Sequence, residues 1–158
     1  MYRVGFGNDI HELKEGRILV LGGVEVPSDV EAVGHSDADA LLHAVTDSIL
    51  GALALGDIGS HFSEKDKRWE GADSEIFLNE TVKMMREKGF EVENIDSTIS
   101  LEKPKLREQI ESMRSNLSRL LGVNIDQVSI KAKTGEGFDA VGTRQAIKAE
   151  ACILLKKV

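Results

Sequence analysis

The sequence of 158 residues contains few of the residues that are typical of disulfide-bonded and nucleic-acid-binding proteins. Its one cysteine, Cys152, cannot form an internal disulfide, which favours a reducing compartment. Aromatic residues make up only 4%, too few for the stacking surfaces of single-strand-binding proteins. Lysines and arginines number 20 against 27 acidic residues, and a net charge of -7 argues against a nucleic-acid partner.

Long apolar runs are also missing. No stretch reaches the length needed to span a bilayer, so we expect no membrane partner. Arg3, Asp9 and His11 interrupt any apolar run near Met1 that would resemble a signal peptide. We therefore expect a cytoplasmic location. The negative charge does not exclude a nucleotide ligand, because a bound metal ion can supply positive charge locally.

What is present is typical of a globular protein, with 41% hydrophobic and 30% charged residues. The chain is long enough to bury a core, and it contains no internal repeat, low-complexity tract or linker. We therefore predict a single compact domain over residues 1–158.

Hydrophobic periodicity predicts elements in the order β-β-α-α-β-α-β-β. Ser36 is expected to cap the first helix, with Asp39 as its capping-box partner. Pro104 suits the first turn of the third helix. The order indicates an α+β fold, a mixed sheet with helices packed on one face. The predicted strands are 2–6, 17–26, 91–101, 128–133 and 147–155, and the predicted helices are 36–55, 73–88 and 104–121.

A group of candidate metal ligands comes from the first strand and the first helix. Asp9 and His11 are two residues apart on a strand, so their side chains point to one side. With His43 they offer one carboxylate and two imidazoles, a set that suits catalytic zinc. Asp39 and Asp47 lie four residues from His43 on either side and could orient its ring. The residues alone leave open that all of these are ordinary solvated or half-buried polar groups.

Two further polar clusters could bind anions. His35 to Asp39 precede the first helix, where free backbone N–H groups favour an anion. Helix capping explains Ser36 and Asp39, but it does not explain His35. In Lys131 to Gly137, glycines, lysines, a hydroxyl and a carboxylate could engage a phosphate and its magnesium. A polar turn between two strands accounts for this second cluster equally well.

Together the motifs resemble one family, that of 2-C-methyl-D-erythritol 2,4-cyclodiphosphate synthase. The resemblance covers essentially the whole chain and implies a homotrimer with sheets toward the three-fold axis and active sites between subunits. The motifs that carry it are D-I-H at 9–11, H-S-D-A-D at 35–39, L-H-A-V-T-D at 42–47, L-G-D-I-G at 55–59, G-A-D-S at 71–74, K-P-K at 103–105 and K-A-K-T-G-E at 131–136.

The resemblance implies a cyclising phosphorus–oxygen lyase of the non-mevalonate isoprenoid pathway. Its small-molecule substrate would be 4-diphosphocytidyl-2-C-methyl-D-erythritol 2-phosphate. Metal-assisted attack of the 2-phosphate on the β-phosphate would form 2-C-methyl-D-erythritol 2,4-cyclodiphosphate and release CMP.

The resemblance also implies roles for matched positions. Asp9, His11 and His43 would bind Zn2+, and Glu136 would bind a second ion, Mg2+ or Mn2+. His35, Thr134 and Glu136 would be catalytic. Phe62 to Asp66 would form a mobile loop over the substrate, and the residues from Leu101 onward would form a cytidine pocket across the subunit interface. The implied substrate contacts are Asp9, His11, His35, Ser36, Asp57, Ile58, Gly59, Phe62, Ser63, Glu64, Lys65, Asp66, Leu101, Lys105, Leu106, Arg107, Ala132, Lys133, Thr134 and Glu136.

Two other functions fit part of the pattern. A zinc-dependent phosphoester hydrolase could use the same Asp/His/His set with bound water as nucleophile, and it would leave no cyclic product. A non-enzymatic trimeric ligand-binding module would show no metal-dependent turnover.

Overall fold

The computed structural model describes residues 1–158 and is built around a five-stranded sheet with the order β4-β1-β7-β5-β6. β5 and β6 are parallel, and the other neighbours are antiparallel. Two further strands, β2 and β3, form a separate hairpin. The strands are β1 (Tyr2–Glu15), β2 (Ile18–Leu21), β3 (Val24–Pro27), β4 (Val30–Ala32), β5 (Phe90–Ser100), β6 (Val128–Lys133) and β7 (Ala146–Lys157).

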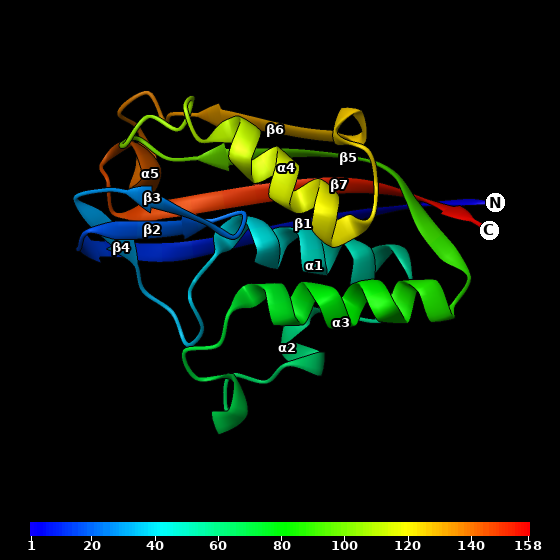
Figure 1. Ribbon diagram of the computed structural model, residues 1–158. Helices are drawn as coiled ribbons and strands as arrows, with labels where there is room; N and C mark the ends of the chain where they lie inside the picture. The colour runs from blue at the N-terminus through cyan, green and yellow to red at the C-terminus, as the bar shows by residue number, and fades with distance from the viewer.

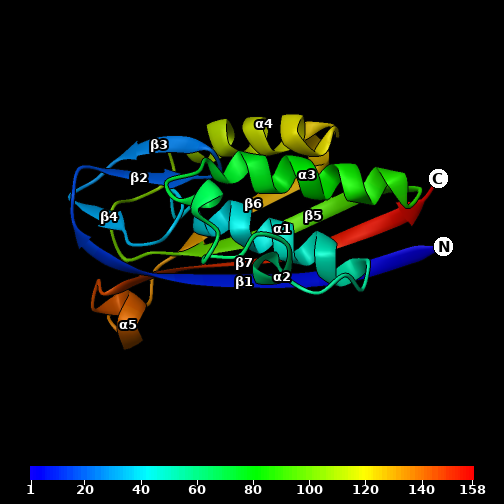
Figure 2. The same cartoon turned by 90° about the horizontal axis from the view of Figure 1, so that it is seen from below.

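The long helices all lie on one face of this sheet, as Figures 1 and 2 show. The predicted α+β class, with a mixed sheet and helices on one face, is therefore confirmed. None of the helices is long and apolar enough to cross a membrane. The helices are α1 (Ala40–Ala52), α2 (Ile58–His61), α3 (Ser74–Glu87), α4 (Ile110–Leu121) and α5 (Asp139–Gly142), with 3-10 helices η1 (Lys67–Trp69) and η2 (Ile125–Gln127).

Two glycines of β1 allow α1 to lie directly on the strand. A Cβ atom added to Gly5 would lie 1.8 Å from the Ser48 carbonyl oxygen, and one added to Gly7 would lie 2.0 Å from that of Ala44. Because side chains alternate along a strand, Asp9 and His11 lie on the same face as these glycines. The close approach therefore brings α1, with His43, over the two polar residues of β1.

The hydrophobic core fills the space between helices and sheet. On β7 the stretch from Ile147 to Leu155 contributes its apolar side chains to this core and not to the opposite face of the sheet. Every second residue of that stretch, from Ile147 onward, is buried in the core that the helices cover. The exposed apolar side chains of the opposite sheet face come instead from β1, where Val4, Phe6 and Ile10 are 57–68% exposed.

Several strand boundaries differ from the predictions. β1 continues to Glu15, so Asp9 and His11 lie inside the strand rather than at its end. Its backbone pairs with β7 from Tyr2 to Glu12, and this pairing holds the polar stretch extended. The predicted strand 17–26 is a hairpin, because Gly22 and Gly23 both have positive φ and form its two-residue turn.

The starts of two helices also differ. α1 begins at Ala40 with Asp39 as its N-cap, and Ser36 does not cap it. The Asp39 carboxylate accepts a hydrogen bond from the backbone N–H of Leu42, so the cap lies three residues later than predicted. α4 begins at Ile110 instead of Pro104, and the segment between them consists of bends and turns from which Leu106 is buried in the core.

Candidate metal centre and adjoining pockets

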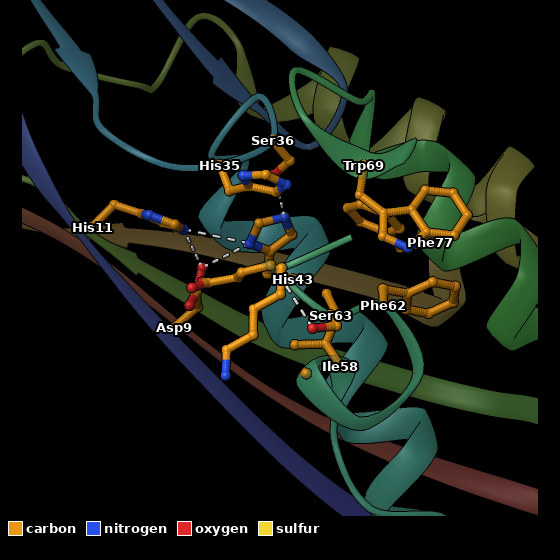
Figure 3. Close-up of a pocket in the computed structure, with 13 residues that line it drawn as sticks. Asp9, His11, His35, Ser36, His43, Ile58, Phe62, Ser63, Trp69 and Phe77 are labelled. Atoms are coloured by element: carbon orange, nitrogen blue, oxygen red, sulfur yellow. Dashed lines mark hydrogen bonds and ion pairs between the residues drawn. The ribbon is translucent and has the colours of Figure 1, made fainter. Parts of the chain in front are cut away.

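Asp9 and His11 on β1 meet His43 on α1 at one point, where the three side chains face one another (Figure 3). Asp9 Oδ2 lies 2.6 Å from His11 Nε2 and 3.1 Å from His43 Nδ1. The two ring nitrogens are 3.4 Å apart. The structure thus brings the predicted ligands together as a potential metal site.

The donors of this centre fit a divalent metal ion. His11 Nδ1 lies 3.0 Å from the Val33 carbonyl, and a neutral ring that donates there leaves Nε2 free to bind a metal. His43 Nε2 is 2.7 Å from Ser74 Oγ, so its Nδ1 faces the centre. Two nitrogen ligands of a tetrahedral zinc ion lie roughly 3.3 Å apart. This is close to the 3.4 Å between His11 Nε2 and His43 Nδ1.

The environment of the centre stabilises a negative charge on Asp9 and a positive charge on His11. Burial alone would raise the pKa of Asp9, but hydrogen bonds from His11 and His43 outweigh it and hold that pKa below its ordinary value. Burial alone would lower the pKa of His11, but the hydrogen bond and charge of Asp9 raise it instead. The site therefore stabilises a positive charge next to the Asp9 carboxylate.

Asp39 and Asp47 do not orient His43, so that expectation is wrong. Asp39 is fully buried and accepts hydrogen bonds from Gly22 and Gly23 as well as capping α1. Burial raises the pKa of Asp39 to about 6. Asp47 accepts a hydrogen bond from the Ile58 backbone, 2.7 Å away. The side chains that contact the His43 ring at Nε2 are Ser74 and Ser36. Ser74 belongs to the G-A-D-S motif, but its role was not foreseen.

A pocket of about 360 Å³ opens beside the metal centre. Asp57 and Asp66 were predicted to contact the substrate, as were several residues that line this pocket. Neither aspartate lines it, because each caps a short helix. Trp69 and Phe77 line it and were not predicted; with Phe62 they form an aromatic cluster. The predicted residues that line this pocket are Asp9, His11, His35, Ser36, His43, Ile58, Gly59, Phe62, Ser63, Glu64 and Lys65.

A second pocket, of about 230 Å³, lies where β5 and β6 end. It shares no lining residue with the first pocket. Glu136 is exposed, lines neither pocket, and is not among the grouped metal-ligand atoms. Within one chain, Thr134 and Glu136 are therefore not brought to the metal centre. The predicted residues that line the second pocket are Leu101, Lys105, Leu106, Arg107, Ala132, Lys133 and Thr134.

Fold and site together define an α+β protein with an Asp/His/His metal centre between strand and helix, open to a ligand-sized pocket. The model of the YgbB family matches residues 2–156, and the chain belongs to this family.

Similar proteins agree with this assignment. The chain is 52% identical over 155 residues to the 2-C-methyl-D-erythritol 2,4-cyclodiphosphate synthase of Brachyspira hyodysenteriae, with 98% of both chains covered. It is 51% identical to the synthase of Clostridioides difficile, over 97% of this chain and 96% of the other. A solved structure of such a synthase in its CDP-bound form has a TM-score of 0.91 at 39% identity, covering 98% of this chain and all of the other. The resemblance and the enzyme class predicted from the motifs are confirmed.

Proposed function

We propose that this protein converts 4-diphosphocytidyl-2-C-methyl-D-erythritol 2-phosphate into 2-C-methyl-D-erythritol 2,4-cyclodiphosphate and CMP. The reaction is an intramolecular phosphoryl transfer in the non-mevalonate route to isoprenoid precursors. The observation that carries the proposal is the Asp9/His11/His43 centre beside a pocket of about 360 Å³, in a chain whose relatives are synthases of this kind.

The metal at this centre is zinc, held by Asp9 Oδ2, His11 Nε2 and His43 Nδ1. One carboxylate and two imidazoles suit this ion and leave a coordination position open. Bound there, zinc supplies Lewis acidity that polarises a phosphoryl oxygen.

The side chains around the centre orient the substrate and offset its charge. Phe62 to Lys65 border the pocket and hold the methylerythritol phosphate, with Lys65 adding a positive charge. His35 and Ser36 also line this pocket, where His35 stabilises charge on the transferred phosphate. Asp57 does not line the pocket but directly precedes Ile58 and Gly59, which do, and it binds sugar hydroxyls from that edge. The attacking phosphate is already anionic, so no protein nucleophile or strong base is needed, and catalysis depends on positioning and charge neutralisation.

The complete site is formed between two chains of a homotrimer. Two observations support this arrangement: the pockets share no residue, and the sheet leaves Val4, Phe6 and Ile10 exposed on its uncovered face. A neighbouring chain contributes the second pocket as the cytidine site, together with Thr134 and Glu136. Glu136 would hold the second ion, magnesium or manganese, through its carboxylate, and that ion would offset charge on the substrate.

Two supporting points concern the nucleotide and the location. The solved synthase in its CDP-bound form supports a cytidine diphosphate ligand. An exposed, unpaired Cys152 is compatible with a reducing cytoplasm.

The decisive experiment incubates the protein with the cytidine diphosphate substrate, zinc and magnesium, and reads the products by mass spectrometry. We expect CMP and the cyclic diphosphate in equal amounts, and no product from protein stripped of metal. CMP accompanied only by an open-chain product would indicate a hydrolase and would contradict the proposal.

A further inference from the structure

The His43 ring is held from behind by a chain of polar contacts that no part of the proposed reaction uses. On the side away from Asp9 and His11, its Nε2 atom lies 2.7 Å from Ser74 Oγ. Ser74 Oγ in turn donates a hydrogen bond to Asp37 Oδ1. Ser74 is fully buried and is the first residue of α3, whereas Asp37 precedes α1, so the chain also connects two helices.

The direction of each hydrogen bond follows from the atoms at its end. Asp37 Oδ2 accepts the backbone N–H of Ser74 at 3.1 Å, and Oδ1 accepts that of Asp39 at 3.2 Å. Both oxygens face donors, as a carboxylate requires, because a carboxylate only accepts. The Ser74 hydroxyl therefore gives its single proton to Asp37.

With its proton directed at Asp37, Ser74 Oγ presents only lone pairs to His43. If Nε2 carried no proton, its lone pair would face a lone pair of Ser74 Oγ only 2.7 Å away, which is repulsive. Nε2 of His43 therefore carries a proton and donates it to Ser74 Oγ. Ser36 Oγ, 3.2 Å from the same nitrogen, is positioned as a second acceptor. With the Nε2 proton fixed on Ser74, a metal ion replaces any proton that Nδ1 shares with Asp9, and Nδ1 is the atom that faces Asp9 and His11.

We infer that Asp37 and Ser74 are positioning residues that fix the tautomer and orientation of His43, so that Nδ1 is its metal-binding atom. This inference depends on the metal site of the proposed function. An imidazole ligand of a metal is oriented by the partner of its other nitrogen, and loss of such a partner lowers metal affinity by about 10- to 100-fold.

Zinc affinity, measured by competition with a chelator, tests the inference. Ser74→Ala removes the acceptor, and Asp37→Asn introduces an amide that can donate to Ser74 and reverse its hydroxyl. Each should weaken zinc binding by about 10- to 100-fold. Ser74→Thr keeps the hydroxyl and should restore most of the affinity.

Two matched controls separate this effect from general damage. Ser48→Ala also deletes a fully buried hydroxyl, but one that bonds the Val45 carbonyl within α1. Asp73→Asn makes the same charge change one residue from Ser74 and keeps a side chain that can cap α3. Both should bind zinc as the unaltered protein does.

A spectroscopic measurement reports the tautomer directly. Imidazole 15N chemical shifts of the zinc-bound protein should show His43 with its proton on Nε2 and its metal on Nδ1. Asp37→Asn should shift the ring toward the Nδ1–H form. Equal zinc affinity and unchanged 15N shifts in Ser74→Ala and Asp37→Asn would overturn the inference. Failure of the unaltered protein to bind zinc would instead overturn the metal site itself.

Discussion

His43 is the residue that connects the metal centre to the rest of the fold. Its ring, only 9% exposed, contacts Asp9 of β1 and Ser74 of α3, and it lies beside Phe77 at the pocket wall. Because these contacts come from different elements, the ring position depends on how strand and helices pack. The metal centre is thus sensitive both to its ligands and to the packing that holds them.

Removal of the His11 ring tests the ligand set with little disturbance of the core. The ring lies at the edge of the pocket, and its hydrogen bond to the Val33 carbonyl is exposed. His11→Ala should therefore lose zinc, as measured by elemental analysis after dialysis, while its circular dichroism stays unchanged. His61→Ala is the control, because that ring bonds the Leu55 carbonyl outside the pocket. Full zinc content in His11→Ala would show that the ligand set is wrong.

The raised pKa of His11 predicts how zinc binding depends on pH. Burial opposes protonation of the ring, but the neighbouring Asp9 carboxylate outweighs it, so the ring takes up its proton above the ordinary value of 6.5. Zinc binds only the deprotonated ring. Below the raised pKa, affinity should therefore fall about tenfold per pH unit through this group, and above it affinity should level off. Chelator competition over a pH series measures this, and a flat profile would contradict it.

At the scale of elements, the close approach of β1 and α1 determines where His43 lies. Gly7→Ala places a Cβ atom 2.0 Å from the Ala44 carbonyl, so α1 must move outward and take His43 away from Asp9. We expect a loss of about 1–3 kcal/mol in the free energy of unfolding and weaker zinc binding. Gly51→Ala is the control, because its nearest neighbour is an oxygen 3.7 Å away. In a helix it should stabilise the protein by about 0.5–1 kcal/mol. Urea unfolding measures both, and unchanged stability in Gly7→Ala would contradict the packing argument.

Asp39 connects the start of α1 to the turn between β2 and β3, and its raised pKa gives this contact a pH signature. Its carboxyl is protonated in the folded state at pH values where it is ionised in the unfolded chain, so folding takes up a proton between 3.8 and about 6. Its contribution to stability is therefore largest below 3.8 and falls as pH rises to about 6, by an amount of order 3 kcal/mol. Asp39→Asn cannot take up this proton on folding. Its loss of stability relative to the unaltered protein should therefore be larger at acidic pH than at neutral pH. Urea unfolding of both proteins without metal checks the sign.

The sequence predicted the long helices from local periodicity, whereas the triad as a set of ligands was implied by the family resemblance. Asp9 and His11 share a face whenever their strand forms. The sequence could not predict contacts between residues that are far apart in the chain. The cap of α1 is Asp39 because a distant hairpin turn also donates to it, and nothing near Ser36 reveals that turn. Trp69 and Ser74 join the site only through the path of the chain between α2 and α3.

For the whole molecule, the two faces of the sheet differ in what covers them. The helices cover one face (Figure 1). The other face carries exposed apolar side chains from β1 and, on β5 and β6, the Lys131–Asp96 ion pair. Exposed large apolar groups gathered on one sheet face mark an interaction surface. A three-fold arrangement of such faces would bury them between chains.

Phe6→Asp tests this arrangement as a whole. Phe6 is 57% exposed in the single chain, so an aspartate there costs that chain little, but burial of three unpaired charges in an assembly would be strongly unfavourable. We expect light scattering to show a trimer for the unaltered protein and a monomer for Phe6→Asp. The monomer should keep its zinc, because the triad belongs to one chain, and should lose turnover, because the proposed site takes its cytidine pocket from the neighbour. Ile76→Asp, at a 44% exposed position on α3 among the helices, should stay trimeric and active. A trimeric Phe6→Asp would show that the uncovered sheet face is not the interface, and a fully active monomer would show that the site does not need two chains.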